Sequence, residues 1–290
     1  MSQEIPMSHD RTEGNGEVFT ASIDQSQTGF IEQLSVNLGL IGGGPGPSEL
    51  IAGDEEAGYF GTVSSSNLID GNSLASELGI TQGTSINSTT DWLKFALDGK
   101  TVFVTKKSIR HSISWETLYL AGAVYGDGLK AGESGAEHHN TEGNSGTLTA
   151  TRQDAQVTID GNTYTVRLLK GVDEDPTNTW DDADSGAIGP GNEWNKIMLP
   201  IHTNAPDSWN NPEYVDNPTE DWGIGFTDSD LVTHYDYGDG SRSWCQETRD
   251  TDTVSRVNRG NDGVSYLIAT NSDSTYGSTF GWRPLLILEE

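Results

Sequence analysis

Two Asp-Gly pairs are the sequence feature that most restricts how this 290-residue chain can fold. Asp98-Gly99 interrupts the stretch 91–105, and Asp160-Gly161 interrupts the stretch 157–169; apolar and polar residues alternate on both sides of each pair. An Asp-Gly pair between alternating apolar runs is the strongest short-range signal for a β-hairpin. The sequence therefore predicts two hairpins in the first two thirds of the chain.

The residues around these hairpins favour many short strands over long helices. The chain contains 35 glycines, and Asn, Asp, Ser and Thr crowd the stretches between short apolar runs. Glycine and small polar residues between short apolar runs are typical of turns between strands. Ser114 and Gly122 delimit one short capped helix, and the apolar run 285–288 predicts a buried terminal strand. We expect a β-rich α+β fold with long loops, and the pattern excludes a helical bundle.

Residues 1–60 differ from the rest of the chain. A polar start is followed by apolar alternation from Leu34 to Leu40 and then by the Gly/Pro segment 42–47, which continues neither a helix nor a strand. We predict an extended N-terminal arm at 1–60 that pairs with a neighbouring subunit, although a tail without a role fits the same pattern. The prediction for 61–290 is one head domain. Its parts are hairpins and a short helix at 91–170, then acidic loops and a C-terminal strand pair at 171–290.

The charge of the chain limits its partners. Forty-four acidic residues face sixteen basic ones, which gives a formal charge of -28. Such a chain repels phosphate backbones, so nucleic-acid binding is not expected. Concentrated salt screens self-repulsion of this kind, which favours a halophilic source. An ordinary acidic protein, whose carboxylates keep its surface soluble, is the alternative.

The cysteine content and the hydropathy of the chain argue against further classes of protein. Cys245 is the only cysteine, so one chain can form neither a disulfide nor a cysteine-based zinc site. No run of about eighteen apolar residues occurs, so we expect no membrane insertion. The first sixteen residues lack the apolar core of a secretory signal.

The C-terminal residues resemble a known family. The segment Ser255-Arg256-Val257-Asn258-Arg259-Gly260 and the later segment Phe280-Gly281-Trp282-Arg283-Pro284 are similar to the ending of C-type-lectin-like domains of the formylglycine-generating and phage-receptor-binding type. The upstream stretch 240–248 resembles sequences of phage structural proteins. The resemblance implies a C-type-lectin-like head in which the two segments pair as strands and the residues between them form an exposed ligand-binding face.

The same resemblance implies a particle protein of a tailed virus. We expect a tail fibre, baseplate spike or capsid turret that is assembled in the host cytoplasm and contacts other virion proteins and copies of itself. A host-surface glycan or surface-layer glycoprotein is the expected ligand. Catalysis is not expected, because the oxidising branch of the family needs two cysteines and the six histidines here are scattered. A capsid-decorating protein that only stabilises the shell and a surface polysaccharide depolymerase are the alternatives.

The resemblance and the aromatic content together define candidate ligand residues. A flat aromatic ring beside polar acceptors is the usual chemistry of sugar recognition. The expected ligand-binding residues are Tyr266, Asn271, Asp273, Tyr276 and Trp244. The alternative for each aromatic ring is packing in the core.

Charged clusters add two weaker hypotheses. Asp228, Asp230, Asp236 and Asp239 place hard oxygen ligands near turn-forming glycines, as a Ca²⁺ site requires, although chance clustering in an acidic chain fits too. No other cofactor is expected. Five basic residues in the stretch 94–110 suggest either a docking surface for an acidic neighbour or strand-edge lysines that block sheet pairing.

Overall fold

The computed structural model describes residues 8–10, 18–20, 41–136, 142–143, 146–178, 192–203, 221–233, 238–250, 254–261, 263–271 and 278–289. Contacts divide the chain into two units, 1–40 and 41–290. In the first unit, strands β1 (Ser8–Asp10) and β2 (Val18–Thr20) pair antiparallel. The predicted strand at 34–40 lies outside the described residues.

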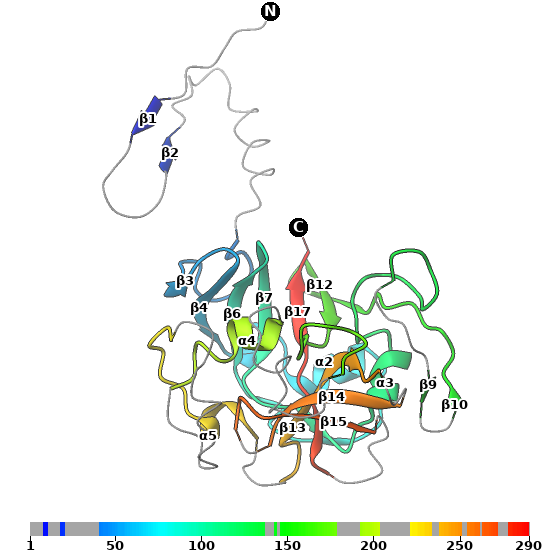
Figure 1. The fold of residues 1–290 in the computed structure, drawn as a ribbon. Helices are drawn as coiled ribbons and strands as arrows, with labels where there is room; N and C mark the ends of the chain where they lie inside the picture. The colour runs from blue at the N-terminus through cyan, green and yellow to red at the C-terminus, as the bar shows by residue number, and fades with distance from the viewer. Residues whose placement is uncertain are drawn as a thin grey trace, which may run out of the picture. The chain divides into compact units, whose positions relative to one another are not determined.

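One sheet of the second unit contains both predicted hairpins (Figure 1). Its seven strands follow the order β11 (Gln156–Ile159), β12 (Asn162–Arg167), β17 (Leu285–Leu288), β7 (Lys100–Thr105), β6 (Trp92–Leu97), β4 (Ala57–Val63) and β3 (Ala52–Gly53). Both Asp-Gly pairs adopt positive φ, 48° and 73° at Asp98-Gly99 and 49° and 84° at Asp160-Gly161. This backbone matches the twist of two-residue hairpin turns. The two hairpins and the buried terminal strand are therefore confirmed.

The second sheet has six strands, and β14 and β15 run across the direction of β7, β17 and β12 (Figure 1). Its order is β15 (Leu267–Asn271), β14 (Ser255–Gly260), β13 (Arg242–Thr248), β16 (Phe280–Trp282), β8 (Arg110–His111) and β5 (Thr84–Ser85). A small separate pair consists of β9 (Glu142–Gly143) and β10 (Gly146–Thr147). The expected β-rich fold is thus confirmed at this level, whereas a C-type-lectin-like head stays a prediction.

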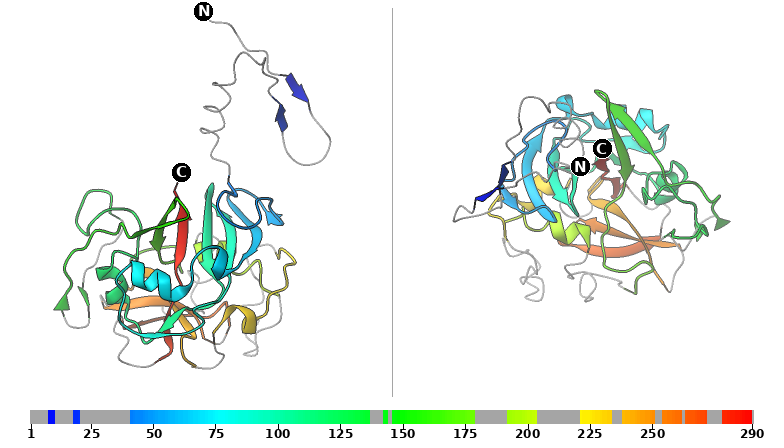
Figure 2. Two further views of the ribbon diagram at one scale, coloured as in Figure 1. Left: turned by 180° about the vertical axis from the view of Figure 1, so that it is seen from behind. Right: turned by 90° about the horizontal axis from the view of Figure 1, so that it is seen from above.

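The described residues contain four short α-helices, α2 (Gly71–Glu77), α3 (Trp115–Leu120), α4 (Glu193–Ile197) and α5 (Asp228–Leu231), and the 3₁₀ turn η2 (Ser65–Asn67). Ser114 caps α3 by accepting from the Thr117 N–H, and Gly122 follows the helix at φ 75°, so the predicted capped helix is confirmed. Helix α2 is seen best from behind (Figure 2). Among these described helices, none has the length and apolar content needed to cross a bilayer.

One expectation for the C-terminal third was wrong, and one strand there was not predicted. The strands 255–260 and 280–282 do not pair with each other, because β13 lies between them, antiparallel to β14 and parallel to β16. The strand that was not predicted is β13, an inner strand of the six-stranded sheet within the region 171–254, which was expected to be mostly loops. Both of its faces are buried, so the alternation that marks a half-exposed strand is missing from its sequence.

A pair of strands passes from one sheet into the other and joins them. Strands β7 and β17 pair in the seven-stranded sheet, and their continuations β8 and β16 pair in the six-stranded sheet. At the corner, Thr105 N–H donates to the Pro284 carbonyl and Ile109 N–H donates to the Trp282 carbonyl. Gly281 is required here because a Cβ atom would stand 2.7 Å from Ser108 Oγ. We call residues 105–109 and 282–284 the corner.

The core consists of two hydrophobic clusters. One contains the inward side chains of α2 and α3 with Phe103, Trp244 and Trp282. The other contains α4, α5 and their neighbours with Phe95, Trp194 and Cys245. Both clusters take residues from both sheets, so neither sheet buries its apolar faces without the other.

Many of the basic side chains are buried. Among the described residues, six basic ones are buried, namely Lys94, Arg167, Arg242, Arg256, Arg259 and Arg283, whereas the buried acidic ones are Glu193 and Glu247. The outer surface is therefore more strongly acidic than the composition suggests. Lys94 had been grouped with a basic surface cluster, and that grouping was wrong, because its side chain is fully enclosed.

Lys94 holds the Gly/Pro segment against the seven-stranded sheet. Its ammonium group donates to the Gly42 carbonyl at 2.8 Å and lies 5.4 Å from the ring centre of Phe60. The Gly42 N–H donates to Thr101 Oγ1 at 2.7 Å. Residues 41–60 thus belong to the head unit, although we predicted an N-terminal arm that extends to residue 60.

Substitution of Gly46 should test this packing. Gly46 has φ 81°, and an added Cβ would lie 2.4 Å from Val63 Cγ2, whereas Gly79 has φ 66° and no atom within 4 Å. Gly79→Ala should cost about 1–2 kcal/mol from the left-handed backbone alone. Gly46→Ala should cost about 1–3 kcal/mol more, because the methyl group overpacks the site. Urea unfolding of both variants measures the difference, and equal losses would show that the segment is loosely packed.

Candidate functional site

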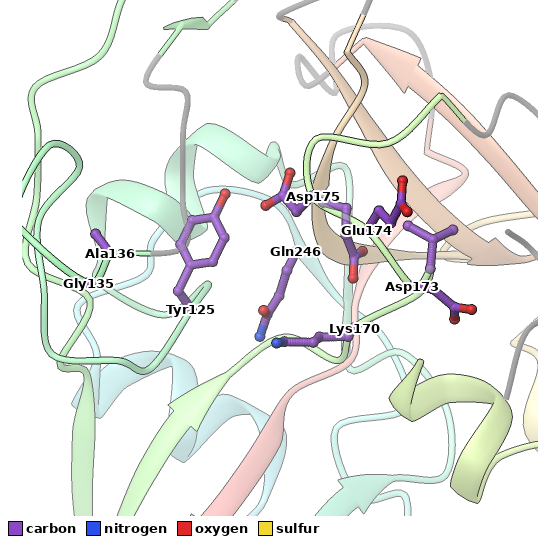
Figure 3. Close-up of a pocket in the computed structure, with 10 residues that line it drawn as sticks. Tyr125, Gly135, Ala136, Lys170, Asp173, Glu174, Asp175 and Gln246 are labelled. Carbon is purple, nitrogen blue, oxygen red and sulfur yellow. The ribbon is translucent and has the colours of Figure 1, made fainter. Parts of the chain in front are cut away.

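One concave feature of the described residues is a groove beside β13, part of which Figure 3 shows. It consists of two pockets of about 420 and 320 Å³ that share the lining residues Tyr125, Gly135, Lys170 and Gln246. We call it the Lys170 groove. Tyr125 follows α3, Lys170 follows β12, and Gln246 belongs to β13, so three distant parts of the chain meet there.

An irregularity in β13 turns side chains into this groove. Trp244 pairs with Asn258 and Thr248 pairs with Arg256, so the three residues Cys245–Glu247 face the single residue Val257 on β14. Extra residues on one strand form a bulge, which interrupts the ladder and re-aims side chains. The bulge therefore frees Gln246 and Glu247 from regular pairing with β14 and makes them available to the chain that follows β12.

The loop 168–177 forms hydrogen bonds with the groups that the bulge frees. Gln246 N–H donates to the Leu169 carbonyl at 3.2 Å, and its side-chain amide donates to the Leu168 carbonyl at 2.8 Å. Further along, Thr248 N–H donates to Asp175 Oδ1 at 2.8 Å, and Thr177 N–H donates to the Thr248 carbonyl at 2.8 Å. These bonds fix the loop that carries Lys170 and Asp173–Asp175 along one wall of the groove.

A buried ion pair supports the other end of the groove. Arg167 contacts Glu193 through two bonds of 2.6 and 2.8 Å, and Glu193 Oε2 also accepts from the Lys170 N–H at 3.0 Å. A bidentate pair of this kind fixes both position and orientation. It ties β12 to α4 directly under Lys170, and Asn192 at the start of α4 donates to Asp173 Oδ1 at 3.0 Å.

Glu247 is a buried carboxyl at the base of the groove. Both of its oxygens accept from the Gly171 N–H, at 2.9 and 3.0 Å, and the side chain is 2% exposed. Burial, reinforced by the charge of Asp175, raises the pKa of Glu247 from 4.5 to about 8. At neutral pH this carboxyl is therefore largely protonated, while the outer carboxylates of the groove carry its negative charge.

The groove presents groups that suit a ligand rich in hydroxyls. Asp173 and Glu174 are exposed acceptors, Lys170 is a half-buried donor, and Lys170 and Gln246 extend toward the same part of the pocket, which Tyr125 borders (Figure 3). Sugar hydroxyls donate and accept at once, so mixed acceptors and donors beside an aromatic side chain fit them. The residues that line the groove outside its aromatic part carry mostly negative charge, which disfavours anionic ligands.

The expected ligand residues are not assembled into one face by the described structure. Trp244 is 1% exposed, stacks on Phe280 at 4.6 Å and donates to the Ile113 carbonyl at 2.8 Å, so its role is in the core and its ring is closed to ligands. Tyr266 is half-buried beside Arg242. Asn271 ends β15 opposite Ser255. Asp273 and Tyr276 lie outside the described residues.

The aspartates proposed for Ca²⁺ are engaged separately. Asp228 accepts from Val264 N–H at 2.7 Å and lies 3.2 Å from His202 Nε2, while Asp230 forms a capping box with Thr227 at the start of α5. Asp239 lies beside His111, at 4.0 Å, and Asp236 is outside the described residues. Within the described ranges, no three His, Cys, Asp or Glu side chains converge as a metal site. Ca²⁺ binding stays a prediction.

Sequence reasoning missed the residues that make the groove. Asp173–Asp175 fall in the region that was expected to form acidic loops, and Tyr125, Lys170, Gln246 and Glu247 were not singled out. The usable signal was weak: Gln246-Glu247 directly follows Trp244-Cys245, and a polar pair beside large apolar side chains in a strand can mark a bulge or a site.

Comparisons with family models, curated proteins and solved structures find no match for this chain. The groove, the bulge and the two-sheet fold therefore carry the functional argument.

Glu247→Gln should change how stability depends on pH. Because the pKa of Glu247 is 4.5 when unfolded and about 8 when folded, the folded chain holds a proton that the unfolded chain releases between these values. The free energy of unfolding should thus fall as pH rises through that window, by up to a few kcal/mol. The glutamine variant should lose this part of the slope. Denaturant unfolding at about pH 5 and about pH 8 measures it, and parallel slopes in both proteins would contradict the assignment.

Proposed function

We propose that this chain is a structural protein of a tailed-virus particle, a tail fibre, baseplate spike or capsid turret, that attaches to the host surface. The Lys170 groove is the proposed binding site, and a host-surface glycan or the glycan of a surface-layer glycoprotein is the proposed ligand. The observation that carries the proposal is the groove itself, where exposed acceptors, a lysine and a tyrosine meet on a rigid two-sheet scaffold.

The state of the groove's carboxyl groups supports binding over catalysis. Glycoside hydrolysis needs a pair of carboxyl groups facing the bond that breaks. Here Glu193 is bound to Arg167, Glu247 accepts from the backbone with both oxygens, and Asp175 accepts from Thr248 N–H. Those groups hold the loop in place, so contact is the activity that the arrangement favours.

The remaining features fit an exposed particle protein from a salty environment. Burial of six basic side chains leaves a strongly acidic outer surface, which concentrated salt screens. Contacts group residues 1–40 as a unit of their own, and we propose that these residues bind other virion proteins or further copies of the chain. The resemblance of the C-terminal segments to phage-receptor-binding domains points the same way.

Glycan binding should depend on the exposed charges of the groove. Lys170→Met and Glu174→Gln should each weaken binding to host envelope glycans about tenfold, because each removes a charge-assisted hydrogen bond. Lys130→Met and Glu77→Gln change the same charges outside the groove and serve as matched controls. A glycan array followed by titration measures the effect. Release of cleaved sugars by the wild-type protein would favour the depolymerase alternative instead.

Deletion of residues 1–40 should separate attachment to the particle from folding. The unit 41–290 contains both hydrophobic clusters, so the truncated chain should keep its circular dichroism and its melting temperature. It should, however, fail to enter particles when it replaces the full chain during infection. Particles that carry the truncated protein at the normal level would refute the proposed role of these residues.

A further inference from the structure

Gln246 presents an acceptor to the Lys170 groove that the described chain does not use. The residue is 4% exposed, and its Nε2 group donates to the Leu168 carbonyl at 2.8 Å, which fixes the orientation of the amide. The other amide atom, Oε1, accepts no hydrogen bond from the described residues, and it is not among the enclosed atoms that lack a partner. It is therefore open to the groove, where Gln246 lines both pockets (Figure 3).

The wall of the larger pocket consists of further acceptors. Asp173, Glu174 and Asp175 line this pocket, and Glu174 is exposed. We call it the acidic pocket. A carboxylate has about four acceptor positions, so the bond from Asn192 to Asp173 leaves most of them available to a ligand. A ligand that fits the acidic pocket must therefore be rich in donors.

The acidic pocket also carries a net negative charge at neutral pH. Among the described residues that line it, Lys170 is the basic one, and it faces the three carboxylates of 173–175. Glu247 contributes little charge, because burial raises its pKa to about 8. Acidic side chains along one concave surface raise the local concentration of cations. A donor that carries positive charge is thus favoured over a neutral donor.

The smaller pocket of the groove has more balanced charges. Two of its acids are neutralised by neighbours, since Asp98 contacts Lys196 at 2.9 Å and Glu193 contacts Arg167 at 2.6 Å. The other charged side chains that line it, among the described residues, are Lys100, Asp127 and Lys170. The negative charge of the groove is therefore concentrated at one end.

The dimensions of the groove indicate an extended organic ligand. The two pockets have volumes of about 420 and 320 Å³ and share part of their lining, and each lies within the usual range of ligand pockets, about 300–1,000 Å³. Within the described ranges, no three His, Cys, Asp or Glu side chains converge on one point, as a metal ion would require. A ligand with a cationic group on one part and uncharged hydroxyl groups on the next matches both pockets.

We propose that the Lys170 groove binds a glycan that contains an amino sugar, whose ammonium group donates to Gln246 Oε1 in the acidic pocket while the adjoining sugar occupies the smaller pocket. The inference rests on the proposed function, because it names the class of glycan that the same groove takes. N-acetylation removes the positive charge and adds an acyl group, so the acetylated sugar loses the attraction of the carboxylates.

Titration calorimetry with two disaccharides tests the proposal. A disaccharide of glucosamine and its di-N-acetylated form differ only in charge and acyl groups. At the lowest salt concentration that keeps the chain folded, the amino form should bind the wild-type protein about tenfold more tightly. The ratio should fall as salt is added, because salt screens the carboxylates. 1,4-Diaminobutane carries the same charges without sugar rings, and it should bind much more weakly than the amino disaccharide.

Substitutions separate the groove from the rest of the acidic surface. Gln246→Leu removes the acceptor without changing the charge of the protein, so it should weaken binding of the amino disaccharide about tenfold. Because Gln246 also holds Leu168, the exposed Glu174→Gln supplies a second variant, which should reduce the preference for the amino form several-fold. Glu77→Gln makes the same change outside the groove and should leave the preference unchanged. Melting temperatures check that each variant is folded.

Equal or tighter binding of the acetylated disaccharide by the wild-type protein would overturn this inference and leave glycan attachment intact. Equal effects of Glu174→Gln and Glu77→Gln would overturn it too, because attraction to the whole acidic surface would then explain the preference. Failure to bind any glycan, amino or neutral, would instead refute the proposed function itself.

Discussion

The two-strand ribbon that crosses from one sheet to the other is the constraint on which the head depends. Strands β7 and β17 pair in one sheet, their continuations β8 and β16 pair in the other, and residues 105–109 and 282–284 make the corner between them. Strand β17 lies between β7 and β12, so the seven-stranded sheet is complete only after this strand has paired with both neighbours. Both hydrophobic clusters are assembled around this ribbon, so their packing energies are shared between the sheets.

The site follows from a departure from regular pairing. Had β13 kept one register along β14, Gln246 and Glu247 would have paired within the sheet. The bulge gives their backbone and side chains to the loop 168–177, and that loop becomes a wall with Lys170 and three consecutive acids on it. Such a wall is held by hydrogen bonds to a rigid strand, which limits the conformational freedom that a ligand must remove.

The placement of basic side chains in this protein differs from that in most soluble proteins. Basic side chains mostly remain at protein surfaces, yet here six are buried and several lie over aromatic rings, as Arg256 does over Trp115 at 4.1 Å and Lys94 over Phe60. Burial of cations makes the outside more acidic and leaves interior charges that need partners. Glu193 meets that need at Arg167, whereas the described chain offers no such carboxylate at Arg283.

Local chemistry decided what could be predicted from the sequence. The Asp-Gly turns, the cap at Ser114 and the apolar terminal strand depend on neighbouring residues, and the sequence determined them, along with the β-rich class and the acidic surface. The order of strands, the bulge in β13 and the groove depend on pairings between residues far apart in the chain, which periodicity does not encode. For the same reason Trp244 and Lys94 were predicted to be outside: an isolated indole or ammonium group reveals its surroundings only after Phe280, Ile113 and Gly42 have been brought to it.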